Sequence, residues 1–158
     1  MRKVLSQSNM TLISIALSLI SLYVSTAHAQ RDEKLSAFVA QYKALRPEGL
    51  NLWRSAQTAD MAQEARLVSL QKEIFNYRKR LSSLSIGIEE YNLRRQREQR
   101  TYDPDEEHTY LVVARAADAL GNVLAFATDY LSVKKAVYLK VAFKYEEGWR
   151  ALDELVKE

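Results

Sequence analysis

The 158-residue sequence contains no cysteine, only two prolines and only four glycines. Without cysteine the chain has no disulfide, no thiol nucleophile and no cysteine-ligated metal site, so packing has to supply its stability. Proline and glycine are the residues that most often end helices, and their scarcity therefore favours long helices. No segment alternates apolar and polar residues in the way that predicts a half-buried strand.

The first 29 residues have the three parts of a secretory signal peptide. Arg2 and Lys3 give the positive start, an uncharged apolar run covers residues 10–24, and Ala27-His28-Ala29 has the small-residue pattern of a cleavage site. An uncleaved membrane anchor is the alternative, but the run is shorter than the about 20 apolar residues of a spanning helix and contains serines. We expect cleavage near Ala29 and a periplasmic or secreted domain over residues 30–158.

Removal of this segment changes the charge of the chain. The whole sequence has 23 Lys+Arg and 20 Asp+Glu, and two of the basic residues but no acidic residue lie before position 30. The mature part therefore carries 21 basic and 20 acidic side chains. A nearly neutral domain does not predict nucleic-acid binding. We expect contact with a membrane only during export.

Histidine is almost as scarce as cysteine. His28 lies in the segment expected to be removed, so His108 is the single remaining candidate base or metal ligand of this type. No second histidine completes a zinc site, and the sequence has no H-E-x-x-H, no C-x-x-C-H, no G-x-S-x-G and no phosphate-binding glycine loop. We expect no metal, no cofactor and no small-molecule substrate, and an enzyme is the remote alternative.

Hydrophobic periodicity predicts an all-α fold. A short first helix is expected over about 32–45, because the residue before Pro47 resists the helical conformation. A second helix is expected over about 51–100 and a third over about 105–156. Both long helices carry an apolar heptad seam, which in the third runs from Tyr110 to Leu155. The seam of the second helix consists of Leu67, Leu70, Ile74, Tyr77, Leu81, Leu84, Ile88 and Tyr91.

The two long helices predict an antiparallel hairpin, with the short first helix folded against its open end. In this register Tyr91 lies near Tyr110, and Trp53 lies near Gly148. A break in the segment Ser82–Gly87 would instead produce a compact four-helix bundle. We favour the extended hairpin because the seam passes through that segment without losing register.

A basic cluster at the tip of the hairpin is the first candidate partner-binding site. Acidic residues follow it at the start of the third helix. Basic side chains favour a helix C-terminus and acidic ones a helix N-terminus, so the cluster also has a structural explanation, and Arg95 is expected to pair with Glu106. The cluster consists of Arg94, Arg95, Arg97 and Arg100.

Three residues of the third helix are further candidates for partner binding. Phe126 and Tyr130 lie off the seam, where they either cover the first helix or form an apolar surface for a partner. Lys134 lies on the seam itself. It either extends its ammonium to solvent or marks the point where another chain enters.

Two isolated helices bury less apolar surface per residue than a globular domain, so apolar residues outside the seams, such as Val137 and Phe143, require cover. We therefore expect a non-enzymatic exported interaction module, an adaptor, chaperone-like protein or assembly subunit that binds a protein partner or itself.

The gross plan resembles exported helical-hairpin proteins such as periplasmic chaperones and accessory subunits of bacterial secretion or conjugation machines. A secreted effector or an immunity protein is the alternative, and its location in the medium or at the surface would distinguish it.

Overall fold

The computed structural model describes residues 33–98 and 104–157. The signal peptide predicted over residues 1–29 and Arg100 of the basic cluster lie outside these residues. The chain divides into two compact units, residues 1–36 and 37–158, and the second contains the helix bundle. The described residues are helices and short connections, which confirms the all-α prediction.

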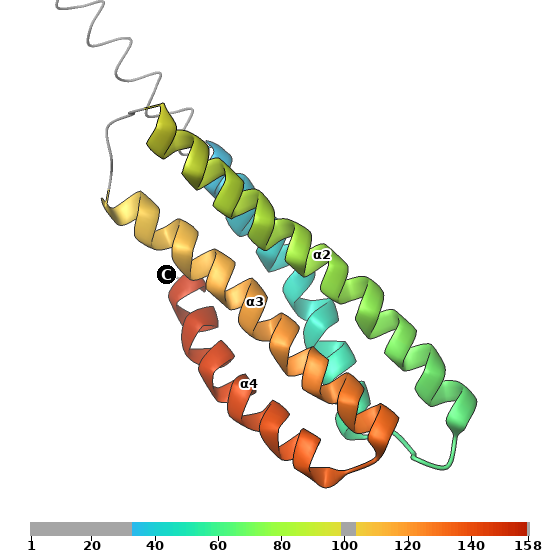
Figure 1. The fold of residues 1–158 in the computed structure, drawn as a ribbon. Coiled ribbons are helices and arrows are strands. Elements are labelled where there is room, and N and C mark those ends of the chain that lie inside the picture. Colours follow the sequence, from blue (N-terminus) through green and yellow to red (C-terminus); the bar gives the residue numbers. More distant parts are fainter. Residues whose placement is uncertain (1–32, 99–103, 158) are drawn as a thin grey trace, which may run out of the picture. The chain divides into compact units, whose positions relative to one another are not determined.

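Four helices make up the described part of the chain (Figure 1). An N-terminal helix over residues 33–57 is followed by α2 (Glu64–Arg97), α3 (Pro104–Val133) and α4 (Ala136–Lys157). Consecutive helices run in opposite directions, and α3 packs against both α2 and α4. All three predicted helices therefore have different bounds from those expected, and the third is divided in two.

The N-terminal helix continues through Pro47 instead of ending before it. A proline inside a helix removes one backbone hydrogen bond and costs about 3 kcal/mol. Packing offsets this cost, because the turns after Pro47 bury Trp53 and Ala56. The Tyr77 hydroxyl of α2 also donates a hydrogen bond to the Leu45 carbonyl at 2.9 Å.

Gly49 allows the neighbouring helices to approach this segment closely. A Cβ at position 49 would lie 2.5 Å from the Tyr77 Oη and 2.9 Å from the Leu120 Cδ2. Such distances are shorter than van der Waals contact, so the position requires a residue without a Cβ. The absence of a side chain at Gly49 thus sets the spacing of the N-terminal helix, α2 and α3.

The helix predicted over 51–100 is interrupted between residues 58 and 63. The Asp60 carboxylate accepts hydrogen bonds from the Ala62 N–H and the Gln63 side chain, each at 3.0 Å. This turn offers the backbone an alternative to helix. α2 then continues without a break through the segment Ser82–Gly87, as the unbroken seam predicts.

The seams of α2 and α3 face the core as predicted. Six of the eight seam residues of α2 are buried, and Leu70 and Tyr91 are half-buried. The rings of Tyr91 and Tyr110 have centroids 5.6 Å apart, which confirms the predicted register of the two helices. The buried seam of α3 consists of Tyr110, Val113, Ala117, Leu120, Leu124, Ala127 and Leu131.

The helix predicted over 105–156 is broken at Lys134 and Lys135. Lys134 has a φ of 58°, and its N–H donates to the Tyr130 carbonyl at 2.8 Å. A residue in the left-handed region is a common way to end a helix, but glycine or asparagine usually occupies it. Since neither is present here, the sequence pattern does not reveal the break.

The break turns α4 back along α3 and changes which of its residues are buried. Trp149 is buried, whereas Tyr145 and Gly148 of the predicted seam are exposed. Trp53 packs against Phe143, with ring centroids 5.2 Å apart. The expected contact of Trp53 with Gly148 is therefore wrong, and a Cβ at Gly148 would meet nothing within 4 Å.

Candidate partner-binding surface

Two acidic residues of α4 point toward the bundle. Glu146 is 8% exposed and Asp153 is 2% exposed. Glu146 accepts a hydrogen bond from Arg150 of its own helix. Asp153 accepts hydrogen bonds from the Arg46 Nε at 2.7 and 2.8 Å and from the Tyr42 hydroxyl at 3.0 Å. These bonds join α4 to the N-terminal helix.

Trp149 completes this buried network. Its Nε1 donates to the Tyr42 hydroxyl oxygen at 2.9 Å. Burial, followed by the nearby Asp153 carboxylate, raises the pKa of Tyr42, so its hydroxyl remains protonated and donates to Asp153. A polar network whose members are hydrogen-bonded specifies one arrangement of its helices. The network therefore determines which side of α4 faces the core.

The apolar side of α4 remains at the surface as a consequence. Val137, Tyr145 and Leu155 are exposed and lie on one side of the helix. Half-buried and small residues lie between them on the same side. We call this set the α4 apolar face: Val137, Val141, Tyr145, Gly148, Leu152 and Leu155.

Phe126 extends the α4 apolar face onto α3. Its ring packs on the ring of Tyr145, with centroids 4.9 Å apart, and it is half-buried. Tyr130, one turn further along α3, is also half-buried. Phe126 thus packs against α4, a contact that neither of its two predicted alternatives included.

Lys134 has a local structural role. Besides its left-handed backbone, its Nζ donates to the Met61 carbonyl at 3.1 Å. This bond joins the α3–α4 connection to the connection that precedes α2. Lys134 is exposed and does not lie on a continuous seam.

The basic cluster is divided between a buried pair and exposed side chains. Arg95 is buried, its Nη2 lies 2.8 Å from the Glu106 Oε2, and its guanidinium lies 5.4 Å from the centre of the Tyr110 ring. This ion pair was predicted and is confirmed. Arg94 and Arg97 are exposed in the last turn of α2, where a helix dipole favours basic residues.

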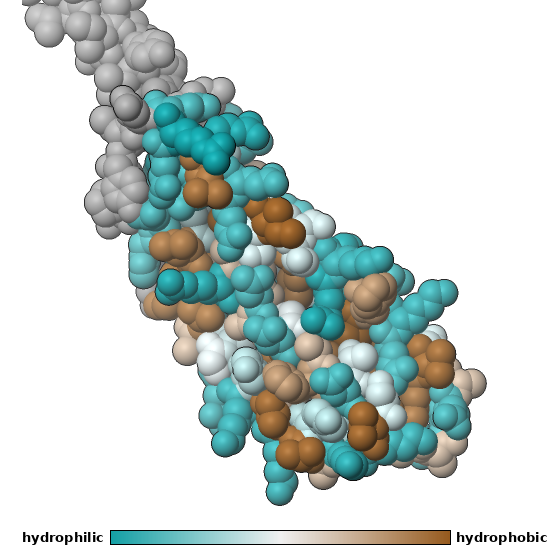
Figure 2. Space-filling view, viewed as in Figure 1, coloured by the Kyte–Doolittle hydropathy of each residue, from teal (hydrophilic) through white to brown (hydrophobic). Residues whose placement is uncertain are grey.

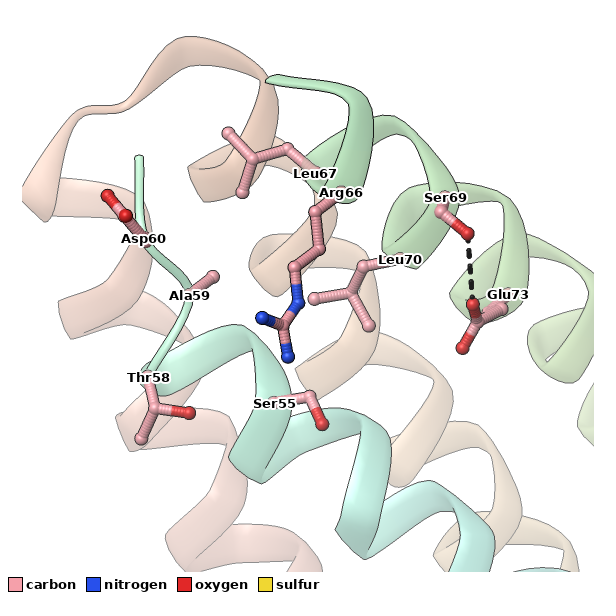
Figure 3. Close-up of a pocket in the computed structure, with 9 residues that line it drawn as sticks. All are labelled: Ser55, Thr58, Ala59, Asp60, Arg66, Leu67, Ser69, Leu70 and Glu73. Carbon is pink, nitrogen blue, oxygen red and sulfur yellow. Dashed lines mark hydrogen bonds between the residues drawn. The ribbon is translucent and has the colours of Figure 1, made fainter. Parts of the chain in front are cut away.

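A cleft of about 340 Å³ opens between the end of the N-terminal helix and the start of α2 (Figure 3). The Arg66 side chain extends into it, and the Ser69 hydroxyl donates to Glu73 at 3.2 Å. Backbone and side-chain hydrogen bonds hold the pKa of Asp60 below its ordinary value. Acidic and basic side chains both line the cleft, so it does not favour a ligand that carries only positive or only negative charge. Its lining consists of Ser55, Thr58, Ala59, Asp60, Arg66, Leu67, Ser69, Leu70 and Glu73.

His108 is exposed on α3. Among residues 33–98 and 104–157, no three His, Cys, Asp or Glu side chains are grouped so that they would hold a metal ion. One described segment, Glu106–Val133, is long and apolar enough to span a membrane. It belongs to α3, which packs against two other helices, and this position accounts for its apolar composition.

No family model, curated protein or solved structure matches this chain. The geometry and chemistry of its surface are therefore the basis for a functional assignment.

Proposed function

We propose that the protein is a non-enzymatic exported module that binds another protein through the α4 apolar face and Phe126. The observation that carries this proposal is the orientation of α4. This helix has two apolar sides: one carries Trp149 and Val156 and is buried together with the carboxylates of Glu146 and Asp153, and the other, the α4 apolar face, lies at the surface. An amphipathic helix in a globular domain ordinarily exposes its polar residues instead of a second apolar side.

The exposure of this face is specified by the structure of the core. The network of Arg46, Tyr42 and Asp153 holds α4 in its orientation. Reversal of the helix would bury the apolar face but leave the Arg46 guanidinium without its carboxylate. Loss of a buried ion-pair partner costs about 3–5 kcal/mol. The fold thus maintains an apolar surface, which is typical of an interface.

The surroundings of the face indicate the chemistry of the partner. Helix geometry places the exposed Lys140 and Lys144 on the edge of the α4 apolar face away from Tyr145, with the exposed Glu147 beyond them. An amphipathic segment with an apolar stripe bordered by acidic residues would match both the apolar face and this basic edge. Phe126 and Tyr145 supply the aromatic contacts that often dominate binding energy.

The signal peptide pattern supports a location outside the cytoplasm for this interaction. A segment with a basic start, an apolar run and Ala27-His28-Ala29 directs a chain out of the cytoplasm. We propose that the partner belongs to the bacterial envelope or a secretion system, and that the protein acts as an adaptor, chaperone-like protein or assembly subunit. Isolation of the periplasmic fraction, followed by N-terminal sequencing, tests cleavage near Ala29.

Site-specific photo-crosslinking in the native compartment tests the surface. A photoreactive residue at Tyr145 is expected to capture another protein, and the same residue at Arg94, at the far end of α2, is the comparison. Capture at Tyr145 that decreases when Leu155 is replaced by Glu supports the proposal. Capture at Arg94 alone, or capture at Tyr145 of nothing except a second copy of this chain, contradicts it.

A further inference from the structure

Four large apolar side chains lie on the outer side of α2. Val68 is 58% exposed, Phe75 54%, Ile86 51% and Leu93 52%. We call them the outer row. Figure 2 shows separate hydrophobic patches along α2 with hydrophilic residues between them. The outer row is independent of the seam of α2, which faces the core.

The outer row is a straight line along the helix. Its members are seven, eleven and seven residues apart. At about 100° per residue, each of these steps returns to within about 20° of the same direction. The row is about 38 Å long at 1.5 Å per residue. A straight apolar line of this length matches another helix that lies alongside it.

The outer row is also symmetric about its centre. Val68 and Leu93 lie at equal distances on either side of the midpoint between residues 80 and 81, and so do Phe75 and Ile86. Two α2 helices placed antiparallel about this midpoint would bring Val68 of one copy opposite Leu93 of the other. Phe75 would likewise lie opposite Ile86. Lys79, whose ammonium lies 4.5 Å from the centre of the Phe75 ring, is exposed in the direction of the row and would face Ser82 of the other copy.

The charges beside the outer row follow the same symmetry with opposite signs. Lys72 and Glu90 lie on the same side of the row, and in the antiparallel arrangement each faces the other residue of the second copy within about one residue's rise of 1.5 Å. Both are exposed, and neither has an ion pair within the part of the chain that the structure describes.

In a parallel pair, Lys72 of one copy and Glu90 of the other lie about 27 Å apart along the helices and cannot form an ion pair. Complementary charges across an interface set orientation and register. The charges therefore select both a second copy of this chain and the antiparallel direction. A surface that is complementary to itself is the requirement for a two-fold dimer.

We propose that the protein forms an antiparallel two-fold dimer through the outer row of α2. One pair of helices buries less than the about 800 Å² per partner of a standard interface, so the dimer exchanges readily with monomer. The α4 apolar face lies on a different helix and takes no part in this contact. The dimer would present two copies of that face to other proteins, and its existence does not depend on the proposed function of α4.

Charge reversal at the predicted pair tests the dimer. In sedimentation equilibrium of the purified protein, Lys72→Glu and Glu90→Lys are each expected to raise the dimer dissociation constant about tenfold, as expected for about 1.4 kcal/mol. The combined Lys72→Glu/Glu90→Lys variant is expected to restore it. Helix content measured by circular dichroism should not change, because both positions are exposed. A wild-type monomer up to millimolar concentration, or a double variant no better than the single ones, overturns the proposal.

Disulfide trapping tests the register in a chain that has no native cysteine. Positions 72 and 90 of one helix are about 27 Å apart, so a Lys72→Cys/Glu90→Cys protein can link them only between two copies. Rapid formation of a covalent dimer is expected. Lys72→Cys/Arg94→Cys, displaced by one turn, is the control and should link more slowly. Equal rates, or faster linking in the single Lys72→Cys variant as in a parallel pair, contradict the register.

Discussion

Two buried tyrosine hydroxyls join the helices through polar bonds within an apolar core. The Tyr42 hydroxyl connects Asp153 and Trp149 of α4 to the N-terminal helix. The Tyr77 hydroxyl connects α2 to the Leu45 carbonyl close to Pro47. Buried polar groups are costly when they lack a partner, so each bond favours one arrangement of the helices.

Gly49→Ala is expected to destabilise the protein by about 1–3 kcal/mol. Alanine is the better helix former by about 1 kcal/mol, but its Cβ would collide with the Tyr77 hydroxyl and with Leu120. Urea unfolding measures the change in the free energy of unfolding. Gly121→Ala is the matched control, because a Cβ there meets nothing within 4 Å and should stabilise by up to about 1 kcal/mol. Equal effects at the two glycines would show that packing at Gly49 is not close.

The orientation of α4 distinguishes it from the other helices. α2 and α3 bury the apolar seams that their periodicity predicts, whereas α4 buries the side that carries Glu146, Trp149 and Asp153 instead of its predicted seam. The connection at Lys134 and Lys135 makes this possible, because it separates α4 from the seam of α3. A continuous helix would have carried the α3 seam on into α4. The break therefore determines which residues are available to a partner.

Lys134→Gly is expected to be more stable than Lys134→Ala by about 1 kcal/mol. Both variants lose the Nζ contact with Met61, but only glycine relieves the left-handed conformation, which has a φ of 58°. Comparison of the two variants by urea unfolding measures the difference. In a helix continuous through position 134, alanine would instead be the more stable by about 1 kcal/mol. The sign of the difference therefore tests the break directly.

The bundle as a whole depends on its interior for stability, because no disulfide supports it. Rings from the N-terminal helix, α2 and α3 meet in the bundle: the centroids of Phe38, Tyr91 and Tyr110 lie 5.6–6.1 Å apart, and Tyr110 is buried while the other two are half-buried. Tyr42, Tyr77 and Tyr110 are buried. Burial is the largest cause that raises the pKa of each of these three hydroxyls.

The protein is expected to lose stability above about pH 10. An unfolded tyrosine ionises near pH 10, whereas these three resist ionisation in the folded state. Their contribution is therefore complete below pH 10 and declines as the pH rises further. Urea unfolding at a series of pH values measures the decline. Tyrosinate absorbance should show that these tyrosines ionise only together with loss of helix, and their ionisation near pH 10 in a fully helical protein would contradict the expectation.

Local patterns were sufficient to predict the helical class, the seams of α2 and α3, and the ion pair of Arg95 with Glu106. These features depend on residues three or four positions apart or on charges at helix ends, and no distant contact has to be known. Phe126 and Tyr130 are candidates because both lie off the seam, and their part in partner binding stays a prediction. The sequence around Asp60 and around Lys134 contains no strong helix-ending pattern, so the breaks in the two predicted helices at these positions were not predicted.

Packing between distant segments determined the features of the fold that local patterns do not predict. It offset the cost of Pro47, and it brought Asp153 to Arg46 and Tyr42, more than a hundred positions away in the chain. Periodicity identifies the apolar side of a helix, but it does not state whether that side is buried. In α4 the buried side combines Trp149 with the carboxylate of Asp153, which accepts hydrogen bonds from Arg46 and Tyr42, and this arrangement leaves the second apolar side exposed. The surface that we propose for partner binding is the consequence.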